Sequence, residues 1–232
     1  MRFGVLAPMP SELRPVVKAF GLRRGRSGSL EGHVGRVGEA DVVATTTGIG
    51  TELATTAAQR MLDRGEVDHV VVVGIAGGIG PTTAVPDLII PEAVVDWPEL
   101  REHRPAPLDR LVGAGTIVSS DEYGYPPEVI ADFIARGVVA VDMETVAVAR
   151  VCADAGIPWS AVRAISDRAD DDTGQHGRQD AVRLRQRPGP GSGCATAARG
   201  SVRGRGVWRQ PRHRCRRPER LALLQRRRHR AG

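Results

Sequence analysis

The feature that most limits the fold of this chain is a run of four consecutive valines at residues 70–73, which ends at Gly74. A continuous β-branched run without polar alternation is typical of a strand that is buried on both faces of a sheet. Such a strand needs helices above and below it. Aromatic residues make up only 3% of the chain, so the core must consist mainly of aliphatic side chains. The run therefore predicts an α/β fold.

Apolar runs and helical periodicities alternate along residues 1–175, which we expect to form one domain. Alternation of strands with helices favours a single three-layer domain with a mostly parallel central sheet flanked by helices. Strands are expected at residues 3–7, 70–74, 87–91, 115–119, 138–141 and 158–165, a hairpin at residues 30–46, and helices at residues 11–20, 51–62, 126–136 and 144–155.

The charge of the chain is distributed unevenly between residues 1–175 and residues 176–232. The second segment holds 17 arginines, no lysine and two acidic residues, which gives it a formal charge of +15. Because the whole chain carries +6, residues 1–175 carry −9. The basic pI near 10.1 therefore describes neither segment.

The arginine-rich segment at residues 176–232 shows no helical or strand periodicity and consists largely of Arg, Gly, Pro and Ala. GC-rich codons encode these four amino acids, so one hypothesis is a gene read out of frame near Gln175, and a related one is a disordered, solvated tail. An alternative is a tail that binds nucleic acid. With one aromatic residue and no lysine, nucleic acid is the less favoured partner. Resequencing the gene would test the frameshift.

Cysteine spacing, the N-terminus and the apolar runs exclude several classes of protein. Cys152, Cys194 and Cys215 show no paired or CxxC spacing, which argues against a disulfide framework or a zinc site. We expect neither a metal nor a cofactor. The N-terminus becomes charged too early for a secretory signal, and the longest apolar run, at residues 70–80, is shorter than the roughly 18 to 20 residues that span a bilayer. A cytoplasmic protein without a membrane partner is predicted.

Glycines follow the valine run at residues 74–80. This segment lacks the GxGxxG order of dinucleotide-binding folds and the lysine of a phosphate-binding P-loop. Glycines at the carboxyl end of a central strand let a ligand approach the backbone closely. The alternative is a tight turn without a ligand.

Carboxylates stand at the ends of several predicted elements, and they are Glu12, Asp142, Glu144 and Asp167. Each alone is more often a helix cap or a solvated loop acid. The carboxyl ends of parallel strands meet at one edge of a sheet, so we expect these side chains to converge there. The sequence therefore predicts an acidic site at that edge.

Four segments carry a resemblance to a known family: FGVLAPMPSE at residues 3–12, GIAGG at 74–78, VDMETVAVARVC at 141–152 and VRAISDRAD at 162–170. In order and spacing they resemble the purine nucleoside phosphorylase superfamily, and within it the 5′-methylthioadenosine/S-adenosylhomocysteine nucleosidases. The resemblance covers residues 1 to about 172. It implies a cofactor-free enzyme that hydrolyses the N-glycosidic bond of an adenosine-type nucleoside.

The resemblance also implies catalytic and binding roles. Asp167 would donate a proton to the purine, and Ser166 would help to position the base. Glu144, next to Met143, would bind the ribose and lie near the positive charge that develops on the sugar. Glu12 would orient and deprotonate the attacking water. These roles suit a reaction that passes through a sugar cation and releases an anionic base.

Further substrate-binding candidates come from the same segments and from Ser119, which begins a Ser-Ser-Asp sequence similar to the family's Ser-Gly-Asp. Ala76 and Gly77 follow the valine run. Asp142 stands where the family has a glutamate. The resemblance does not identify the group at the 5′ position of the substrate.

Two alternatives to a hydrolase remain open. Glu12 would repel a phosphate dianion, but Arg14 lies close by, which keeps a phosphate-dependent phosphorylase as an alternative. The second is a catalytically impaired protein that binds nucleosides or nucleic acid, because relatives have an amphipathic helix where this chain has arginine-rich sequence. Family members are usually homodimers or larger assemblies, and the resemblance implies a homo-oligomeric enzyme of purine salvage, expected as a homodimer.

Overall fold

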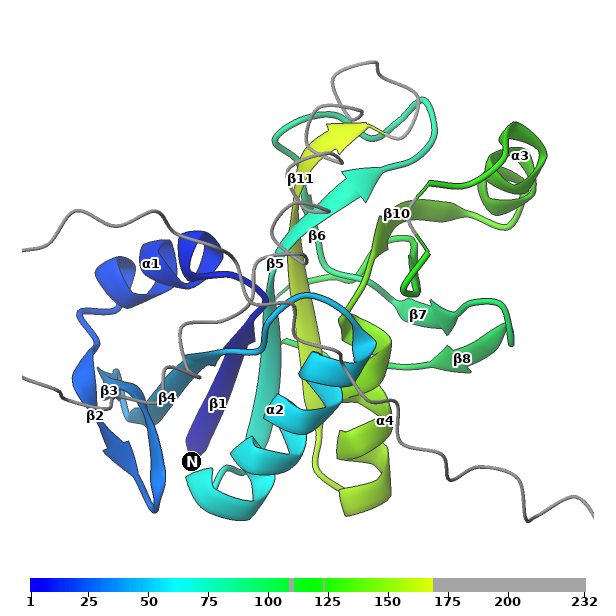
Figure 1. Ribbon diagram of the computed structural model, residues 1–232. Coiled ribbons are helices and arrows are strands. Elements are labelled where there is room, and N and C mark those ends of the chain that lie inside the picture. The colour runs from blue at the N-terminus through cyan, green and yellow to red at the C-terminus, as the bar shows by residue number, and fades with distance from the viewer. Residues whose placement is uncertain (109–110, 123, 169–232) are drawn as a thin grey trace, which may run out of the picture. The chain divides into compact units, whose positions relative to one another are not determined.

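The computed structural model describes residues 1–108, 111–122 and 124–168 (Figure 1). In these ranges a central sheet is flanked by helices, so the predicted α/β fold is confirmed. The strands are β1 (Arg2–Ala7), β2 (Arg23–Ser27), β3 (Leu30–Val37), β4 (Ala40–Thr46), β5 (His69–Gly78), β6 (Leu88–Ile89), β7 (Ala93–Asp96), β8 (Arg101–His103), β9 (Thr116–Ser119), β10 (Val138–Asp142) and β11 (Trp159–Arg168). The helices are α1 (Pro10–Ala19), α2 (Thr51–Gly65), α3 (Pro127–Ala135) and α4 (Thr145–Ala155).

Strand β1 shows how the chain builds a layer on each face of the sheet. Successive side chains of a strand point to opposite faces. Leu6 packs in the core cluster that contains the buried residues of α2 and α4, whereas Val5 and Ala7 pack with Leu13 of α1 in a second cluster. Figure 1 shows α2 and α4 side by side on one face. Helices therefore cover both faces, as a three-layer domain requires.

Strand β5 lies at the centre of the sheet, whose order is β2-β3-β4-β1-β5-β10-β9-β7-β8, with β11 paired to β5 and β6. Parallel pairing joins β4, β1, β5 and β11, and also joins β10, β9 and β7. These two groups meet antiparallel where β10 pairs with Gly77 and Gly78 of β5. The glycine end of β5 is therefore flanked by β10 and β11.

Small residues let α2 lie close to the sheet. The helix buries Ala54, Ala57 and Ala58, and an added Cβ on Gly4 of β1 would come within 2.8 Å of the sulfur of Met61. A larger side chain at any of these positions would push the helix outward. This close packing fixes the N-terminal end of α2, which contributes to the site described below.

The structure corrects several predicted boundaries. Strand β5 runs on to Gly78, so Gly74, Gly77 and Gly78 lie inside a strand and not in a tight turn, whereas Gly80, with a φ of 85°, lies in the bend that follows. The strand predicted at residues 87–91 is reduced to the two residues of β6. Strands β2, β7 and β8 lie where no strand is predicted, and they add antiparallel pairings at the sheet edges. The boundary predicted at residue 175 and the arginine-rich segment lie outside the described residues.

Candidate active site

Three carboxylates and one arginine meet near the carboxyl ends of β1, β5 and β10. We call Glu12, Asp142, Glu144 and Arg163 the buried charge cluster; Glu12 is half-buried and the other three are buried. Arg163 comes from β11 and its side chain is completely buried. Its Nη2 lies 2.8 Å from Oδ2 of Asp142 and 3.7 Å from Oε2 of Glu144. Three of the four predicted carboxylates thus converge as expected.

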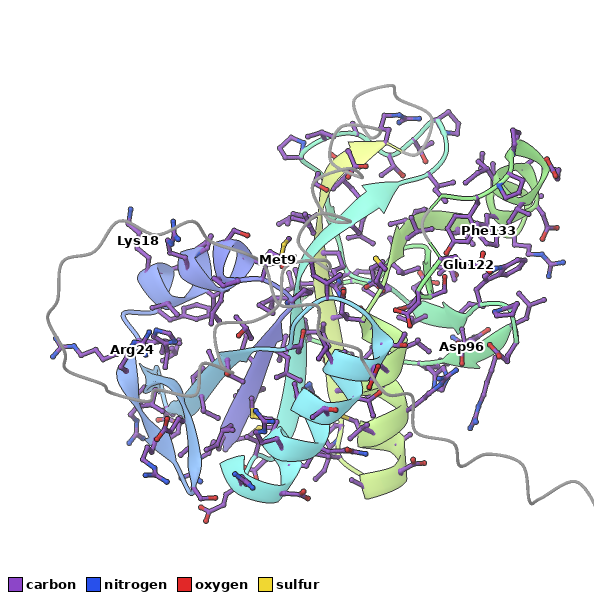
Figure 2. The ribbon with its side chains drawn as sticks, viewed as in Figure 1. Met9, Lys18, Arg24, Asp96, Glu122 and Phe133 are labelled. Carbon is purple, nitrogen blue, oxygen red and sulfur yellow. The ribbon has the colours of Figure 1, made fainter. Side chains whose placement is uncertain are left out.

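Glu12 is fixed by backbone donors from two elements. Its Oε2 accepts a hydrogen bond from the N–H of Met9 at 2.6 Å, and its Oε1 accepts one from the N–H of Ile75 at 2.8 Å. Figure 2 shows Met9 near the centre of the molecule, where β1 ends and α1 begins. An added Cβ on Gly74 would lie 2.6 Å from Oε1 of Glu12 and would overlap Nη1 of Arg163. The site therefore requires glycine at this position.

The N-terminus of α2 is held by two carboxylates from other parts of the chain. Oε1 of Glu144 accepts from the N–H of Gly50 at 2.9 Å, and Oδ1 of Asp121 accepts from the N–H of Thr51 at 2.9 Å. The free N–H groups at a helix N-terminus carry partial positive charge, which carboxylates stabilise. The same contact orients Glu144, whose other oxygen lies on the side of Arg163.

The buried charge cluster holds three carboxylates against one guanidinium, and this imbalance favours uptake of a proton. Burial raises the pKa of Glu144 to about 7; the neighbouring carboxylates add to the rise, and Arg163 opposes it. Burial also raises the pKa of Glu12 above its ordinary value, although the N–H of Ile75 and the charge of Arg163 oppose this effect. Groups with such shifted pKa values can take up or release protons near neutral pH.

Asp142 and Ser119 hold the start of α4. Oδ1 of Asp142 accepts from the N–H groups of Glu144 and Thr145 at 3.3 and 3.2 Å, and its Oδ2 accepts from the hydroxyl of Thr145. Oγ of Ser119 accepts from the N–H of Val146 at 3.1 Å. Both residues therefore help to build the helix start, and the predicted role of each in binding substrate stays a prediction.

The fourth predicted carboxylate, Asp167, lies on the exposed end of β11, and we call Ser166 and Asp167 the β11 tip. Ile165 pairs with Ala76 and Asp167 with Gly77, so Ser166 is an extra residue that forms a β-bulge. Bulges redirect side chains and are common beside active sites. Oγ of Ser166 donates to Oδ1 of Asp167 at 2.7 Å and lies 3.4 Å from the carbonyl oxygen of Ala76.

Gly77 lies between the two parts of the site. It pairs with Asp167 of β11 and with Val141 of β10. An added Cβ there would lie 3.9 Å from Oδ2 of Asp167 and 3.3 Å from Cγ2 of Val141. The half-buried Met143 and then Glu144 follow shortly after Val141 in the chain. The glycine end of β5 therefore separates the β11 tip from the segment that carries the predicted ribose-binding residues.

Arg163 and Thr145 are buried site residues that are absent from the predicted set. Arg163 is the only charged residue in the largely apolar segment at residues 158–165. A charge in a buried strand needs acidic partners, and that signal could have identified it. Thr145 carries no comparable signal. Within the described ranges, no group of three or more His, Cys, Asp or Glu side chains is arranged to hold a metal ion.

Comparison with protein families matches residues 2–107 and 101–187 of this chain to the phosphorylase superfamily. Among curated proteins, the 5′-methylthioadenosine/S-adenosylhomocysteine nucleosidase of Geobacillus thermodenitrificans is 30% identical to it over 175 residues. That match covers 62% of this chain and 73% of the relative.

Solved structures of nucleosidases share the fold. A 5′-methylthioadenosine/S-adenosylhomocysteine nucleosidase from S. pneumoniae, with a transition-state inhibitor, is 21% identical with a TM-score of 0.66, over 79% of this chain and 93% of that chain. A mutant Helicobacter pylori nucleosidase with 5′-methylthioadenosine in its active site is 21% identical with a TM-score of 0.65, over 78% and 92%. Futalosine hydrolase of the same organism is 21% identical with a TM-score of 0.66, over 79% and 91%.

Proposed function

The chain belongs to the phosphorylase superfamily, and we propose that it is a purine nucleosidase. It hydrolyses the N-glycosidic bond of an adenosine-type nucleoside such as 5′-methylthioadenosine or S-adenosylhomocysteine. The Geobacillus relative, a nucleosidase named for these two compounds, supports this substrate class. Futalosine hydrolase has the same fold. The fold therefore does not determine which group the substrate carries at its 5′ position, and this group has to be measured.

The observation that carries the choice of water over phosphate is the position of Glu12. Its carboxylate already takes the N–H donors of Met9 and Ile75 and lies beside Gly74 and Arg163. Free N–H groups and an arginine are what a phosphate dianion would need. Here Glu12 accepts from the two N–H groups, and Arg163 already pairs with Asp142 and Glu144. These carboxylates would repel a phosphate dianion. A neutral water can approach the carboxylate of Glu12 and donate a hydrogen bond to it.

The proposed reaction uses three carboxyl groups. Water attacks C1′ of the ribose while the bond from C1′ to N9 breaks and its electron pair moves to the purine. Glu12 accepts a proton from the water, and its raised pKa makes it a stronger base than an exposed glutamate. Asp167 donates a proton to N7 of the departing base. Glu144 accepts hydrogen bonds from the ribose hydroxyls and stabilises the positive charge that develops on the sugar.

Other residues contact the substrate in this proposal without exchanging protons. The glycine end of β5 lets the ligand approach the backbone, and the β11 tip contacts the base. The residues are Ala76, Gly77, Ser119, Asp142, Met143 and Ser166. No metal or cofactor takes part in these steps.

The proposed setting is a cytoplasmic homodimer in purine salvage, as the resemblance to the nucleosidases implies. The partner is a small nucleoside, and nucleic acid is not a proposed partner. No helix within the described ranges is long and apolar enough to cross a membrane.

We expect the arginine-rich segment, which stands where relatives have an amphipathic helix, to weaken both turnover and stability. A cooperative melt above about 55 °C, within the usual mesophile range, would contradict that expectation.

Incubation of the purified chain with 5′-methylthioadenosine, with and without phosphate, tests the proposed function. Release of free adenine at the same rate in both samples is the expected result. Adenine released only with phosphate would identify a phosphorylase instead, and no adenine in either sample would leave a binding protein or an inactive enzyme. A parallel series with S-adenosylhomocysteine and futalosine then compares the 5′ groups by kcat/KM.

A further inference from the structure

Thr145, the first residue of α4, has an unusual set of hydrogen bonds for a residue at a helix start. Its side chain is completely buried. Oγ1 accepts from Nε of Arg163 at 3.2 Å and from Nη2 of the same guanidinium at 2.8 Å, and it donates to Oδ2 of Asp142. A hydroxyl has one proton to donate and two lone pairs to accept with. All of its hydrogen-bonding capacity is therefore directed at the buried charge cluster.

These bonds restrict how the guanidinium can turn. An arginine beside a carboxylate tends to form a two-pronged pair in which two of its N–H groups face one carboxylate. Here the edge made by Nε and Nη2 faces the hydroxyl of Thr145, and only Nη2 also faces Asp142. Nη1 is left beside Gly74 and the carbonyl oxygen of Ile75.

We propose that Thr145 is a positioning residue, whose hydroxyl holds the guanidinium of Arg163 so that one positive charge serves Glu12, Asp142 and Glu144 together. Its catalytic meaning rests on the proposed hydrolysis, in which Glu12 and Glu144 act on the water and the ribose. Without the hydroxyl, the guanidinium can turn into a two-pronged pair with Asp142. Nη1 then leaves the side of Glu12, and Glu144 loses its counter-charge.

The chain offers a matched pair of variants for this proposal. Thr145→Val has the same shape and lacks the hydroxyl, whereas Thr145→Ser keeps the hydroxyl and lacks the methyl group. In Thr145→Val we expect kcat on 5′-methylthioadenosine to fall about 10- to 100-fold, with KM changed less than about threefold, because misplaced groups slow the chemical step more than they weaken binding. In Thr145→Ser we expect kcat to stay within about threefold of the parent chain. Equal kcat values for the two variants would overturn the proposal.

A second measurement separates this proposal from the proposed function, because it needs no turnover. NMR titration of the side-chain carboxyl carbons follows Glu144, whose pKa in the parent chain is about 7. Loss of the counter-charge in Thr145→Val should raise this pKa, whereas Thr145→Ser should leave it in place. The same pKa in all three proteins would overturn the role of Thr145 even if the parent chain is active. A parent chain that releases no adenine would overturn the proposed function alone.

The proposal also stays testable if Thr145→Val does not melt cooperatively. The Nε–H signal of Arg163 in the parent chain, assigned by its loss in Arg163→Lys, reports on the guanidinium directly. A guanidinium held by Thr145 should show a slowly exchanging Nε–H and hindered rotation of its end groups. Rapid exchange with free rotation would overturn the proposal.

Discussion

The buried charge cluster and the β11 tip are built in opposite ways. In the cluster, Glu12 accepts from two backbone N–H groups, and Glu144 accepts from the start of α2 and faces Arg163. At the tip, Ser166 is exposed and Asp167 is half-buried, on a bulged strand end. Backbone donors fix the cluster, whereas the tip relies on the bulge and on a hydrogen bond between two adjacent side chains.

This difference fits the two kinds of chemistry proposed for the site. Groups that orient a water and stabilise a sugar cation act most strongly where the protein fixes them in advance and excludes solvent. A group that hands a proton to a ligand must instead be reachable by that ligand. Substitutions in the cluster should therefore change stability and activity together, and substitutions at the tip should change activity alone.

Asp167→Asn should give the largest effect and is the strictest test of this contrast. Asparagine keeps the shape of the side chain but cannot donate an acidic proton to the base. We expect kcat for adenine release to fall about 10³-fold, within the range for loss of a general acid. Thermal melting should change little, because the carboxyl group lies on a half-exposed strand end.

Asp154→Asn is the matched control, because Asp154 is exposed on α4 away from the site residues described above. Its turnover and melting temperature should both equal those of the parent chain. Retained turnover in Asp167→Asn would remove this residue from the proposed mechanism. A large loss of stability in that variant would remove the contrast between tip and cluster.

Gly74→Ala and Gly77→Ala compare the two parts of the site with the same added methyl group. At Gly74 the methyl would lie 2.6 Å from Oε1 of Glu12 and overlap Arg163. Gly74 does not have a positive φ. Any loss of stability in Gly74→Ala therefore comes from atomic overlap and not from backbone strain. We expect the free energy of unfolding to fall by about 2 to 3 kcal/mol, as in other overpacked sites. Turnover should fall by roughly 10²-fold.

At Gly77 the nearest neighbour of an added Cβ is Cγ2 of Val141 at 3.3 Å, and Oδ2 of Asp167 is 3.9 Å away. This variant should stay within about 1 kcal/mol of the parent chain in stability. Its methyl group would lie between Val141 and Asp167, beside the residues proposed to contact the base, so KM should rise more than kcat falls. Denaturant unfolding and steady-state kinetics on both variants make the comparison, and equal loss of stability in the two would contradict it.

The parts of the fold that could be predicted from sequence are those in which a segment's own residues determine its structure. The valine run identified β5 because only a doubly covered strand tolerates it, and the helix predicted at residues 144–155 is followed by Gly156, a residue type that commonly ends helices. Strand β2, with the sequence Arg-Arg-Gly-Arg-Ser, has no apolar alternation. It is a strand because β3 pairs with it, and such pairing cannot be read from a single segment.

The candidate site divides in the same way. Glu12 and Glu144 could be predicted to converge, because each follows shortly after the carboxyl end of a strand. The sequence could not predict which partners hold them, since the N–H of Ile75 and the start of α2 reach the site only through tertiary packing. Arg163 was not predicted as a site residue, because one arginine in a largely apolar segment does not indicate a site until its acidic partners are known.

Glu144→Gln tests the energetic cost of the buried charge cluster through pH. The pKa of Glu144 is about 7 in the folded chain, above the ordinary value of 4.5 that applies after unfolding. Between these values the folded chain holds a proton that the unfolded chain has lost, so the free energy of unfolding falls as pH rises through this window. Glutamine does not titrate. At pH 8 the free energy of unfolding of the variant should exceed that of the parent chain by on the order of 2 kcal/mol, although its turnover falls by roughly 10²-fold.

Chemical denaturation from pH 5 to pH 8 measures this effect, with Glu39→Gln as the control. Glu39 is exposed in the turn between β3 and β4, so its replacement should leave the pH dependence of the parent chain unchanged. The parent curve should decline, and the Glu144→Gln curve should decline less, because Glu12 still contributes a raised pKa. Parallel curves for parent and variant would show that Glu144 does not carry the buried charge.

Ser166→Ala should give the smallest effect and sharpens the contrast from the side of the β11 tip. The variant removes the hydroxyl that donates to Oδ1 of Asp167 at 2.7 Å. Because Ser166 is exposed, water can replace that donor, and the free energy of unfolding should change by less than about 0.5 kcal/mol. Turnover should fall only about 3- to 10-fold, since Asp167 keeps its carboxyl group but loses part of its orientation. Ser11→Ala, on the exposed side of α1, controls for loss of a surface hydroxyl. A loss of turnover in Ser166→Ala as large as that in Asp167→Asn would mean that the Ser166 hydroxyl alone holds Asp167 in place. The β11 tip would then depend on a fixed hydrogen-bond donor as strictly as the buried charge cluster does, and the contrast between them would be lost.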